Sequence, residues 1–363
     1  MQPQTVHLAL SVPLGRNLVR RALDKGIALA SLPPLYRGAR DSLVEWQHPI
    51  RAPHSITYNL IRAIRARGYR VRLYRYNEHV VAAMRPGDIF IGEPVPQGGY
   101  GESRAKTDDP GSITSRTIHE FPSERNYILM PYAHDEQYIG FLRELARSNA
   151  QAGGGAIFIG GKIWERDWET RSPLADVRSL RKGYLPMAID TSEYPTVKKR
   201  FNPTGKRKYL YIGHTAWYKN TQELERIAAR MPGYEFVHIG GGEVRGWKKR
   251  SNFVALTREY LERLADEFDI FVTVSSADPQ ATTIMEQMCS GLAVACTPES
   301  GYEYDMLTKL SMRDTEGNVE KLRALQTTDE AELLARAKDA RHIVEQNHTW
   351  AQFTDRVLGF IGI

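Results

Sequence analysis

Two series of alternating strand-like and helix-like segments constrain the fold of this chain more than any other feature. In the first half, short apolar or alternating runs predict strands at residues 6–10, 71–76, 88–92, 127–130 and 156–159. Apolar residues at helical spacing predict helices at 55–67 and 138–150. Because strands that alternate with helices usually form a parallel sheet with helical crossovers, this order predicts an α/β domain.

A second series begins after the turn-rich stretch at residues 190–205. Its expected strands are 209–213, 234–240 and 268–274, and its expected helices are 221–230, 258–267 and 282–290. We therefore predict two Rossmann-like α/β domains, residues 1–188 and 189–363. They are expected to face each other across a cleft where the carboxyl ends of both sheets meet. The helix expected at 350–360 is a candidate to pack back on the first domain.

One segment between these elements has the composition of a loop. Residues 92–122 are dense in Gly, Pro, Ser, Asp and Thr, so we expect a long mobile loop there, either disordered or closing over a ligand.

The composition is that of a soluble globular protein. The chain has 363 residues, 42% hydrophobic and 25% charged, without an uncharged apolar run of membrane-spanning length. At the start, the apolar stretch precedes the basic residues, the reverse of a secretory signal, so we expect a cytosolic protein. Cys289 and Cys296 lack the paired spacing of a disulfide framework or a zinc site and are expected to be core thiols.

The charge is unevenly distributed along the chain. Residues 1–190 contain 26 Lys and Arg against 19 Asp and Glu, and the remainder 23 against 24. A basic first half suits an anionic partner such as a lipid-phosphate acceptor, the inner face of a membrane or nucleic acid. A solvated arginine-rich face is the equally simple alternative.

The most informative motif lies at residues 275–305, directly after a predicted strand. Asp278 and Glu286 are separated by seven residues, a helix begins between them, and Cys289-Ser-Gly-Leu-Ala-Val-Ala follows. This pattern resembles the donor-binding signature of retaining GT-B glycosyltransferases, the family 4-like or group 1 type. The family usually has Glu where this chain has Asp278, which shortens the reach toward a sugar.

The physical chemistry of this motif agrees with the resemblance. A helix N-terminus offers unpaired N–H groups and a positive dipole end to a diphosphate, while carboxylates accept hydroxyls of ribose and hexose. The candidate donor contacts here are Asp278, Gln280, Ala281, Thr282, Thr283 and Glu286. The alternative is an ordinary crossover helix whose Glu286 faces solvent.

A second motif, Tyr211-Ile-Gly-His-Thr-Ala-Trp-Tyr-Lys-Asn, is similar to the family's strand-turn-helix element. In that element an Arg follows the Gly, and a Lys five residues later also neutralises the diphosphate. Gly213 and Lys219 match, whereas His214 takes the place of the Arg and leaves one cation fewer at neutral pH. Lys219 as a solvated lysine and His214 as a packing residue are the alternatives.

The block Phe236-Val-His-Ile-Gly-Gly-Gly-Glu resembles the next part of the family pattern. There Gly240 and Gly241 would let the backbone approach the nucleotide, although a plain turn explains them equally well. A dinucleotide fingerprint would need a third glycine at position 245, which is Arg245, so a dehydrogenase is not indicated.

The likeness is looser in the first half. His134 follows a predicted strand where the family places a His near the donor sugar, and His119 is the competing choice. Gly15 follows the first strand and is a candidate to admit the donor phosphates. Both histidines could equally be structural hydrogen-bonding residues, and Gly15 an ordinary turn residue.

The resemblance implies an enzyme that transfers a sugar from a UDP- or GDP-sugar to an acceptor hydroxyl. It implies retention of configuration, no cofactor and no essential metal, with His134, Lys219 and Glu286 as the catalytic candidates. The acceptor would be a saccharide, a lipid-linked molecule or a small metabolite, as in polysaccharide or glycoconjugate biosynthesis.

Two other classes remain open at this point. A catalytically silent sugar-nucleotide-binding or scaffolding protein would fit the departures at Asp278 and His214. A nucleic-acid-binding protein is less well supported, because aromatic residues are not interleaved with the basic runs 198–200 and 248–250.

Overall fold

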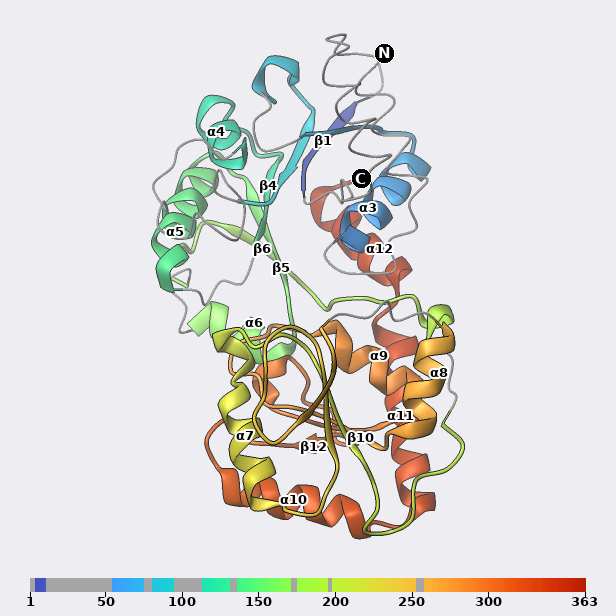
Figure 1. Ribbon diagram of the computed structural model, residues 1–363. Coiled ribbons are helices and arrows are strands. Elements are labelled where there is room, and N and C mark those ends of the chain that lie inside the picture. Colours follow the sequence, from blue (N-terminus) through green and yellow to red (C-terminus); the bar gives the residue numbers. More distant parts are fainter. Residues whose placement is uncertain are drawn as a thin grey trace, which may run out of the picture. The chain divides into compact units, whose positions relative to one another are not determined.

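The computed structural model describes residues 4–10, 54–74, 80–94, 113–130, 136–170, 175–194, 198–252 and 258–363. These residues form two compact units, each with a six-stranded sheet (Figure 1). Unit 1 takes its described residues from Met1–Phe158, Trp168–Leu185 and Thr354–Ile363, and unit 2 takes them from Ile159–Asp167 and Pro186–Phe353. The prediction of an α/β fold with two parallel sheets is confirmed.

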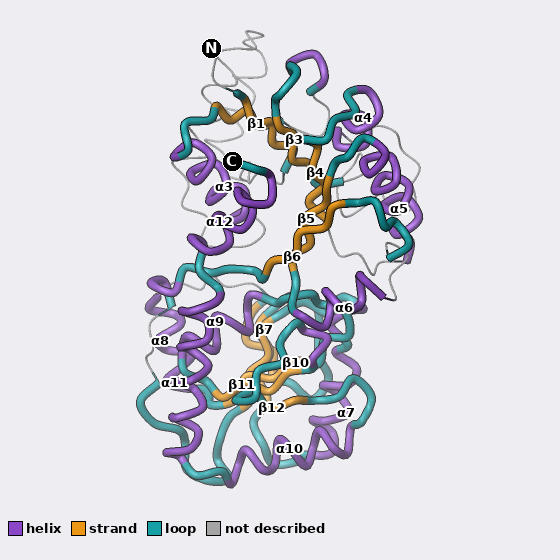
Figure 2. The backbone as a smooth tube through the Cα atoms, turned by 180° about the vertical axis from the view of Figure 1, so that it is seen from behind, coloured by secondary structure: helices purple, strands orange, loops and turns teal. Residues whose placement is uncertain are grey.

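The sheet of unit 1 has the strand order β2-β1-β3-β4-β5-β6. The pairs β1–β2, β1–β3, β3–β4 and β4–β5 are parallel. Helices α3 and α12 lie on one side of this sheet and α4 and α5 on the other (Figures 1 and 2). The elements are β1 Thr5–Ala9, α3 His54–Ala66, β2 Arg70–Leu73, β3 Ile89–Gly92, α4 Ile113–Glu120, β4 Asn126–Met130, α5 Glu136–Gln151, β5 Gly155–Ile159, β6 Arg181–Leu185 and, from Thr354 on, α12 Trp350–Ile361. Helix α6, Lys162–Thr170, is divided between the units, and its residues 162–167 belong to unit 2.

The central strands of unit 1 are buried on both faces, as parallel strands covered by helices must be. Every residue of β3 and β4 is buried. Helix α3 covers this sheet with Leu60, Ile61 and Ile64, which are at most 1% exposed, and turns Arg62 to solvent. The 3.6-residue period of α3 therefore follows directly from the burial of one helix face.

Helix α4 corrects one expectation. The long loop expected at residues 92–122 contains this helix at its end, while residues 95–112 lie outside the described part. Ile113 and Ile118 are buried, and the Thr114 hydroxyl donates to the Glu93 carbonyl at 2.8 Å. Because α4 is short and rich in β-branched residues, which have modest helix propensity, its periodicity is weak in the sequence.

The sheet of unit 2 has the order β12-β11-β10-β7-β8-β9, and its neighbouring strands pair in parallel. Helices α8, α9 and α11 lie on one side and α7 and α10 on the other (Figures 1 and 2). The elements are β7 Tyr209–Ile212, α7 Thr221–Arg230, β8 Phe236–Ile239, β9 Lys248–Ser251, α8 Arg258–Glu267, β10 Ile270–Thr273, α9 Thr282–Ser290, β11 Ala293–Cys296, β12 Thr308–Lys309, α10 Thr315–Thr327 and α11 Glu330–Asn347.

The helices predicted at residues 221–230, 258–267 and 282–290 are confirmed as α7, α8 and α9. Strand β9 was not predicted, because Lys248-Lys-Arg-Ser contains no apolar residue. It pairs only with β8 and closes one edge of the sheet, where exposed basic side chains discourage pairing with another chain.

A buried charge network joins the start of the β7 segment to the end of α8. Asp269 is fully buried and accepts from the backbone N–H groups of Asn202 at 2.9 Å and Lys208 at 2.8 Å. The Nζ atom of Lys198 lies 3.0 Å from Oδ1 of Asp269 and donates to the carbonyl of Phe268 at 2.7 Å. A cation at a helix C-terminus and a carboxylate with several donors each satisfy groups that burial would otherwise leave unpaired.

Within the described ranges, no helix combines the length and the apolar character needed to span a membrane.

We predict that Asp269→Ala destabilises unit 2 by about 3–5 kcal/mol, because it leaves a buried lysine without its carboxylate. Calorimetry should show a fall of at least about 6 °C in the midpoint of unfolding. Asp266→Ala, at an exposed position of the same segment, is the control and should change the midpoint little. Equal midpoints for the two variants would contradict this role of Asp269.

Candidate functional site

The expected site residues of unit 2 gather at the carboxyl ends of three neighbouring strands. β7 lies between β10 and β8, so the loops that follow these strands meet at one edge of the sheet. Gly213 and His214 follow β7, Gly240 and Gly241 follow β8, and Asp278 lies in the loop after β10. Open parallel sheets bind ligands at this edge.

Two glycines allow the loops after β7 and β8 to touch. Gly240 has φ +146°, and a Cβ on it would lie 1.8 Å from the carbonyl oxygen of Gly213. At Gly241 a Cβ would meet only the Cβ of His214, at 3.8 Å. The pair Gly213 and Gly240 therefore brings backbone against backbone, which no larger residue at position 240 would permit.

An ion pair joins the loops after β7 and β10. The Lys219 ammonium contacts a carboxylate oxygen of Asp278, and the two side chains are 13% and 5% exposed. The backbone N–H of Ser276 donates to the Tyr218 carbonyl at 2.8 Å, and the Asn220 amide donates to the Val274 carbonyl at 3.1 Å. These contacts fix Lys219 at the end of the 3₁₀ turn Trp217–Lys219.

The ion pair changes how the two charges can act. The sequence suggested Lys219 for the phosphates and Asp278 for the sugar, but in this structure each is the other's partner. An ammonium group has three N–H donors, so Lys219 can hold Asp278 and still donate to another anionic oxygen. Burying the pair costs desolvation of both charges, which is tolerable only while the pair stays together.

His214 is neutral at physiological pH. Its Nδ1 accepts from the Ala216 N–H at 3.2 Å, so the proton sits on Nε2, which contacts the Tyr218 hydroxyl at 3.1 Å. Burial and, secondarily, the charge of Lys219 lower the pKa of His214 below its ordinary value of 6.5.

Helix α9 begins at Thr282, four residues after Asp278. Ala281 is the N-cap residue and provides no side-chain cap, so the first N–H groups of the helix are not satisfied by such a cap. Thr282 and Thr283, the first two helical residues, are partly exposed. The side chain of Gln280 is engaged elsewhere, because its Oε1 accepts from the Met187 N–H at 2.5 Å.

Glu286 lies one turn further along α9 and is 5% exposed. Its carboxylate accepts from the Tyr194 hydroxyl at 3.4 Å. Glu286 therefore does not face solvent, contrary to one alternative that the sequence left open.

Not every candidate is placed at this edge. Gly15 and His134 lie outside the described residues. His119 belongs to unit 1, where its Nδ1–H donates to the Ser115 carbonyl at 2.7 Å and Nε2 lies 3.4 Å from the Ser148 hydroxyl. The first contact lies within α4, and the second ties α4 to α5.

Three residues at this edge were not singled out from the sequence. Trp217 is 57% exposed and is the sole large hydrophobic side chain with such exposure in the described part of the chain. Asn220, at φ 51°, takes the left-handed conformation that starts α7. His238, in β8, donates from Nε2 to the Gly213 carbonyl at 2.8 Å. Asn next to a helix start was a usable signal, since Asn tolerates this conformation better than most residues.

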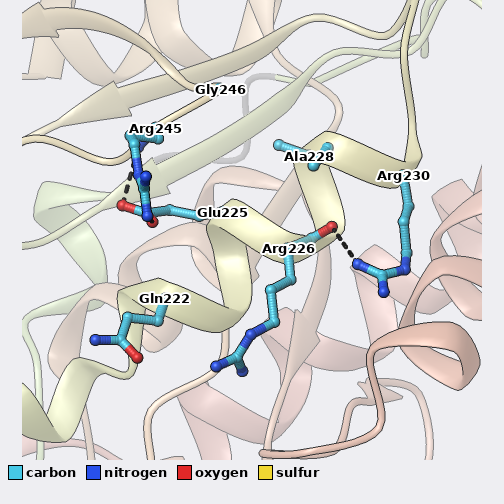
Figure 3. Close-up of a pocket in the computed structure, with 8 residues that line it drawn as sticks. Gln222, Glu225, Arg226, Ala228, Arg230, Arg245 and Gly246 are labelled. Atoms are coloured by element: carbon cyan, nitrogen blue, oxygen red, sulfur yellow. Dashed lines mark hydrogen bonds and ion pairs between the residues drawn. The ribbon is translucent and has the colours of Figure 1, made fainter.

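A separate hollow of about 590 Å³ lies along α7 (Figure 3). Its three arginines are already matched by carboxylates: Arg245 pairs with Glu225, Arg226 with Glu223, and Arg230 with Glu316. The positive charges of this hollow are therefore neutralised within the protein. The lining residues are Gln222, Glu225, Arg226, Ala228, Ala229, Arg230, Arg245 and Gly246.

Among the described residues, no group of three or more His, Cys, Asp or Glu side chains is arranged to hold a metal ion.

The arrangement of two parallel sheets with flanking helices is the GT-B fold of glycosyltransferases, and solved structures share it. Sucrose-phosphate synthase from Thermosynechococcus elongatus is 12% identical, with a TM-score of 0.59 over 98% of this chain and 97% of that chain. The N-terminal domain of Candida albicans trehalose-6-phosphate phosphatase is 10% identical, with a TM-score of 0.58 over 100% and 98%.

A third similar structure is the UDP-forming α,α-trehalose-phosphate synthase from Burkholderia xenovorans in complex with glucose-6-phosphate. It is 11% identical, with a TM-score of 0.55 over 86% of this chain and 79% of that chain. No protein-family model matches the sequence, and no curated protein matches it either. At these identities the similarity establishes the fold alone.

We predict that Gly240→Ala destabilises unit 2 by at least about 2 kcal/mol, through a strained φ and overlap with the Gly213 carbonyl. Gly241→Ala is the matched control, one residue further on, and should change the unfolding free energy by no more than about 1 kcal/mol. Chemical denaturation monitored by circular dichroism measures both. Similar losses in the two variants would show that the contact with Gly213 is unimportant.

Proposed function

We propose that the chain is a glycosyltransferase that moves a sugar from a nucleoside-diphosphate sugar to an acceptor hydroxyl with retention of configuration. Residues 189–363 would bind the donor and residues 1–188 the acceptor. The observation that carries the proposal is the meeting of Gly213, Lys219 and Asp278 beside the N-terminus of α9. A cation, approachable backbone and an unsatisfied helix start are the groups that a diphosphate requires.

In the proposed reaction the acceptor oxygen bonds to the anomeric carbon while the bond from that carbon to the diphosphate oxygen breaks. The acceptor proton passes to an oxygen of the departing diphosphate. We propose no essential metal, because a cation and backbone donors of the protein take its place in stabilising the leaving group. Lys219 and the N–H groups at Thr282 and Thr283 stabilise the negative charge that develops on the diphosphate. Glu286 is proposed to accept ribose hydroxyls and Asp278 hexose hydroxyls.

The remaining candidates complete the proposed site. Gly240 and Gly241 would lie along the nucleotide, and the backbone of Gln280 and Ala281 would border the phosphates. His134 stays our candidate for orienting the transferred sugar, and Gly15 for admitting the phosphates. A UDP- or GDP-sugar is the proposed donor. The basic first half favours an anionic acceptor, such as a lipid-linked saccharide at a membrane surface.

The second candidate function is a catalytically silent protein that binds sugar nucleotides. The Lys219–Asp278 ion pair and the neutral His214 favour it, because both reduce the charge available for transition-state stabilisation. Donor turnover separates the candidates: a silent protein binds the donor and releases neither free nucleotide nor glycosylated product.

We predict that one nucleoside diphosphate among UDP, GDP, ADP and CDP selectively raises the melting temperature, because ligands that bind only the native state stabilise it. Lys219→Ala should weaken the binding of that nucleotide at least about tenfold, because it removes a charge-assisted hydrogen bond. Lys248→Ala, at an exposed lysine of the same unit, is the control. The absence of any shift at millimolar nucleotide, or unchanged affinity in Lys219→Ala, argues against the donor site. Glu286→Ala, measured in the same way, should also weaken the binding of the nucleotide.

We predict that His214 adds affinity for the nucleotide only in acid. The pKa of His214 lies below 6.5, so the imidazole gains its charge as the pH falls below that value and then provides a second cation. The ratio of wild-type to His214→Gln affinity, measured calorimetrically from pH 7.5 to pH 5, should therefore rise toward low pH. Taking the ratio cancels the titration of the nucleotide itself, and a flat ratio would show that His214 does not face the anion.

A further inference from the structure

His238 has an unusual environment for a histidine. It is fully buried in β8, with its ring stacked on Tyr211 at 5.2 Å between centroids. Nε2 donates to the Gly213 carbonyl at 2.8 Å, whereas Nδ1 has no hydrogen-bond partner among the described residues. Leaving a buried nitrogen unpaired costs free energy, and a phenylalanine would fill the same space without that cost. Packing alone therefore does not explain a histidine here.

The bond to Gly213 fixes one peptide at the edge of the proposed donor site. A carbonyl can only accept, so the hydrogen bond places a proton of His238 on Nε2. Burial lowers the pKa of His238, which favours the neutral ring. Gly240 packs against the same carbonyl, since a Cβ on Gly240 would lie 1.8 Å from the Gly213 oxygen. The Gly213 N–H donates to Ile239 at 2.9 Å. The carbonyl of Gly213 is thus held on the β8 side.

The direction of the next N–H follows from the planarity of the peptide. In a trans peptide the C=O and the N–H point in opposite directions, so the N–H of His214 points away from β8. β7 lies between β8 and β10, and the Lys219–Asp278 pair belongs to the loops after β7 and β10. The N–H of His214 has no hydrogen-bond partner among the described residues. It is a donor directed to the side of the sheet that carries Lys219.

We propose that His238 is a positioning residue that holds the Gly213–His214 peptide so that the His214 N–H donates to an oxygen of the donor's diphosphate. The proposal rests on the proposed function for the identity of the ligand. The proposal adds the backbone N–H of His214 to the Lys219 ammonium group as a donor to the diphosphate. The side chain of His238, in β8, would set the direction of that N–H. Tyr211 supports the same arrangement, because its hydroxyl donates to the His214 carbonyl at 2.8 Å.

The test uses inorganic pyrophosphate and the full-length protein labelled with ¹⁵N. Pyrophosphate should move the backbone amide proton of His214 downfield in the wild type, as a new hydrogen bond to an anion requires. His238→Phe, which keeps the ring and removes the donor, should bind pyrophosphate about tenfold more weakly and lose that shift. His238→Gln can place an amide N–H where Nε2 lies in the wild type. It should restore most of the pyrophosphate affinity and most of the His214 amide shift.

Val237→Ala is the control for a purely structural effect. Val237 is buried on the opposite face of β8, so its truncation destabilises the same strand without touching the Gly213 carbonyl. It should lower the melting temperature and leave pyrophosphate binding and the His214 shift unchanged. If Val237→Ala weakens binding as much as His238→Phe, the effect is general loosening of the strand and the proposal is overturned.

Two further outcomes separate this proposal from the proposed function. If pyrophosphate shifts the His214 amide in the wild type but no nucleotide sugar is bound or turned over, the positioning role stands and the glycosyltransferase assignment fails. If pyrophosphate binds without moving that amide, does not bind, or binds equally well to His238→Phe, the positioning role fails whatever the enzymatic activity.

Discussion

The contact between Lys219 and Asp278 is the interaction on which the proposed site depends. Parallel strands do not connect directly at their carboxyl ends, so the loops that leave them have to be tied together by side chains or by backbone contacts outside the ladder. The ion pair does this for the loops after β7 and β10, with the Asn220 amide bonds to Val274 and Met312 beside it. The ion pair and these hydrogen bonds together fix the cation relative to the start of α9.

The glycine contact serves the neighbouring pair of loops in a different way. Gly213 and Gly240 meet through backbone atoms, which requires the absence of a Cβ at position 240 rather than the presence of a charge. His238 then adds one directed hydrogen bond to the Gly213 carbonyl. The two glycines thus allow the loops to come into contact, and the histidine holds the orientation of the Gly213–His214 peptide.

The same edge of the sheet has limited positive charge. His214 is neutral because burial and Lys219 lower its pKa, and Lys219 shares its charge with Asp278. A diphosphate bound here would depend more on backbone N–H groups than a site with an arginine at position 214 would. Neutral donors in a fixed arrangement need no reorganisation as charge develops, which is the property that makes such groups effective in catalysis.

The sequence by itself determined the α/β class, the two series of elements and the bounds of α7, α8 and α9. These follow from hydrophobic period, which is a local property of each segment. It also identified Gly213, Lys219, Asp278 and Gly240 as candidates, because their spacing along the chain follows a known pattern. It did not predict β9, whose basic residues carry no strand period, or α4, whose β-branched residues weaken the helical one.

Only the tertiary structure decided which of these groups touch. That Lys219 pairs with Asp278, that Gly240 lies against Gly213, and that His238 reaches the Gly213 carbonyl all depend on the strand order β10-β7-β8. Strand order is set by how helices cover the sheet as a whole, and no local pattern encodes it. Residues 59 positions apart, such as Lys219 and Asp278, become partners only once that order is fixed.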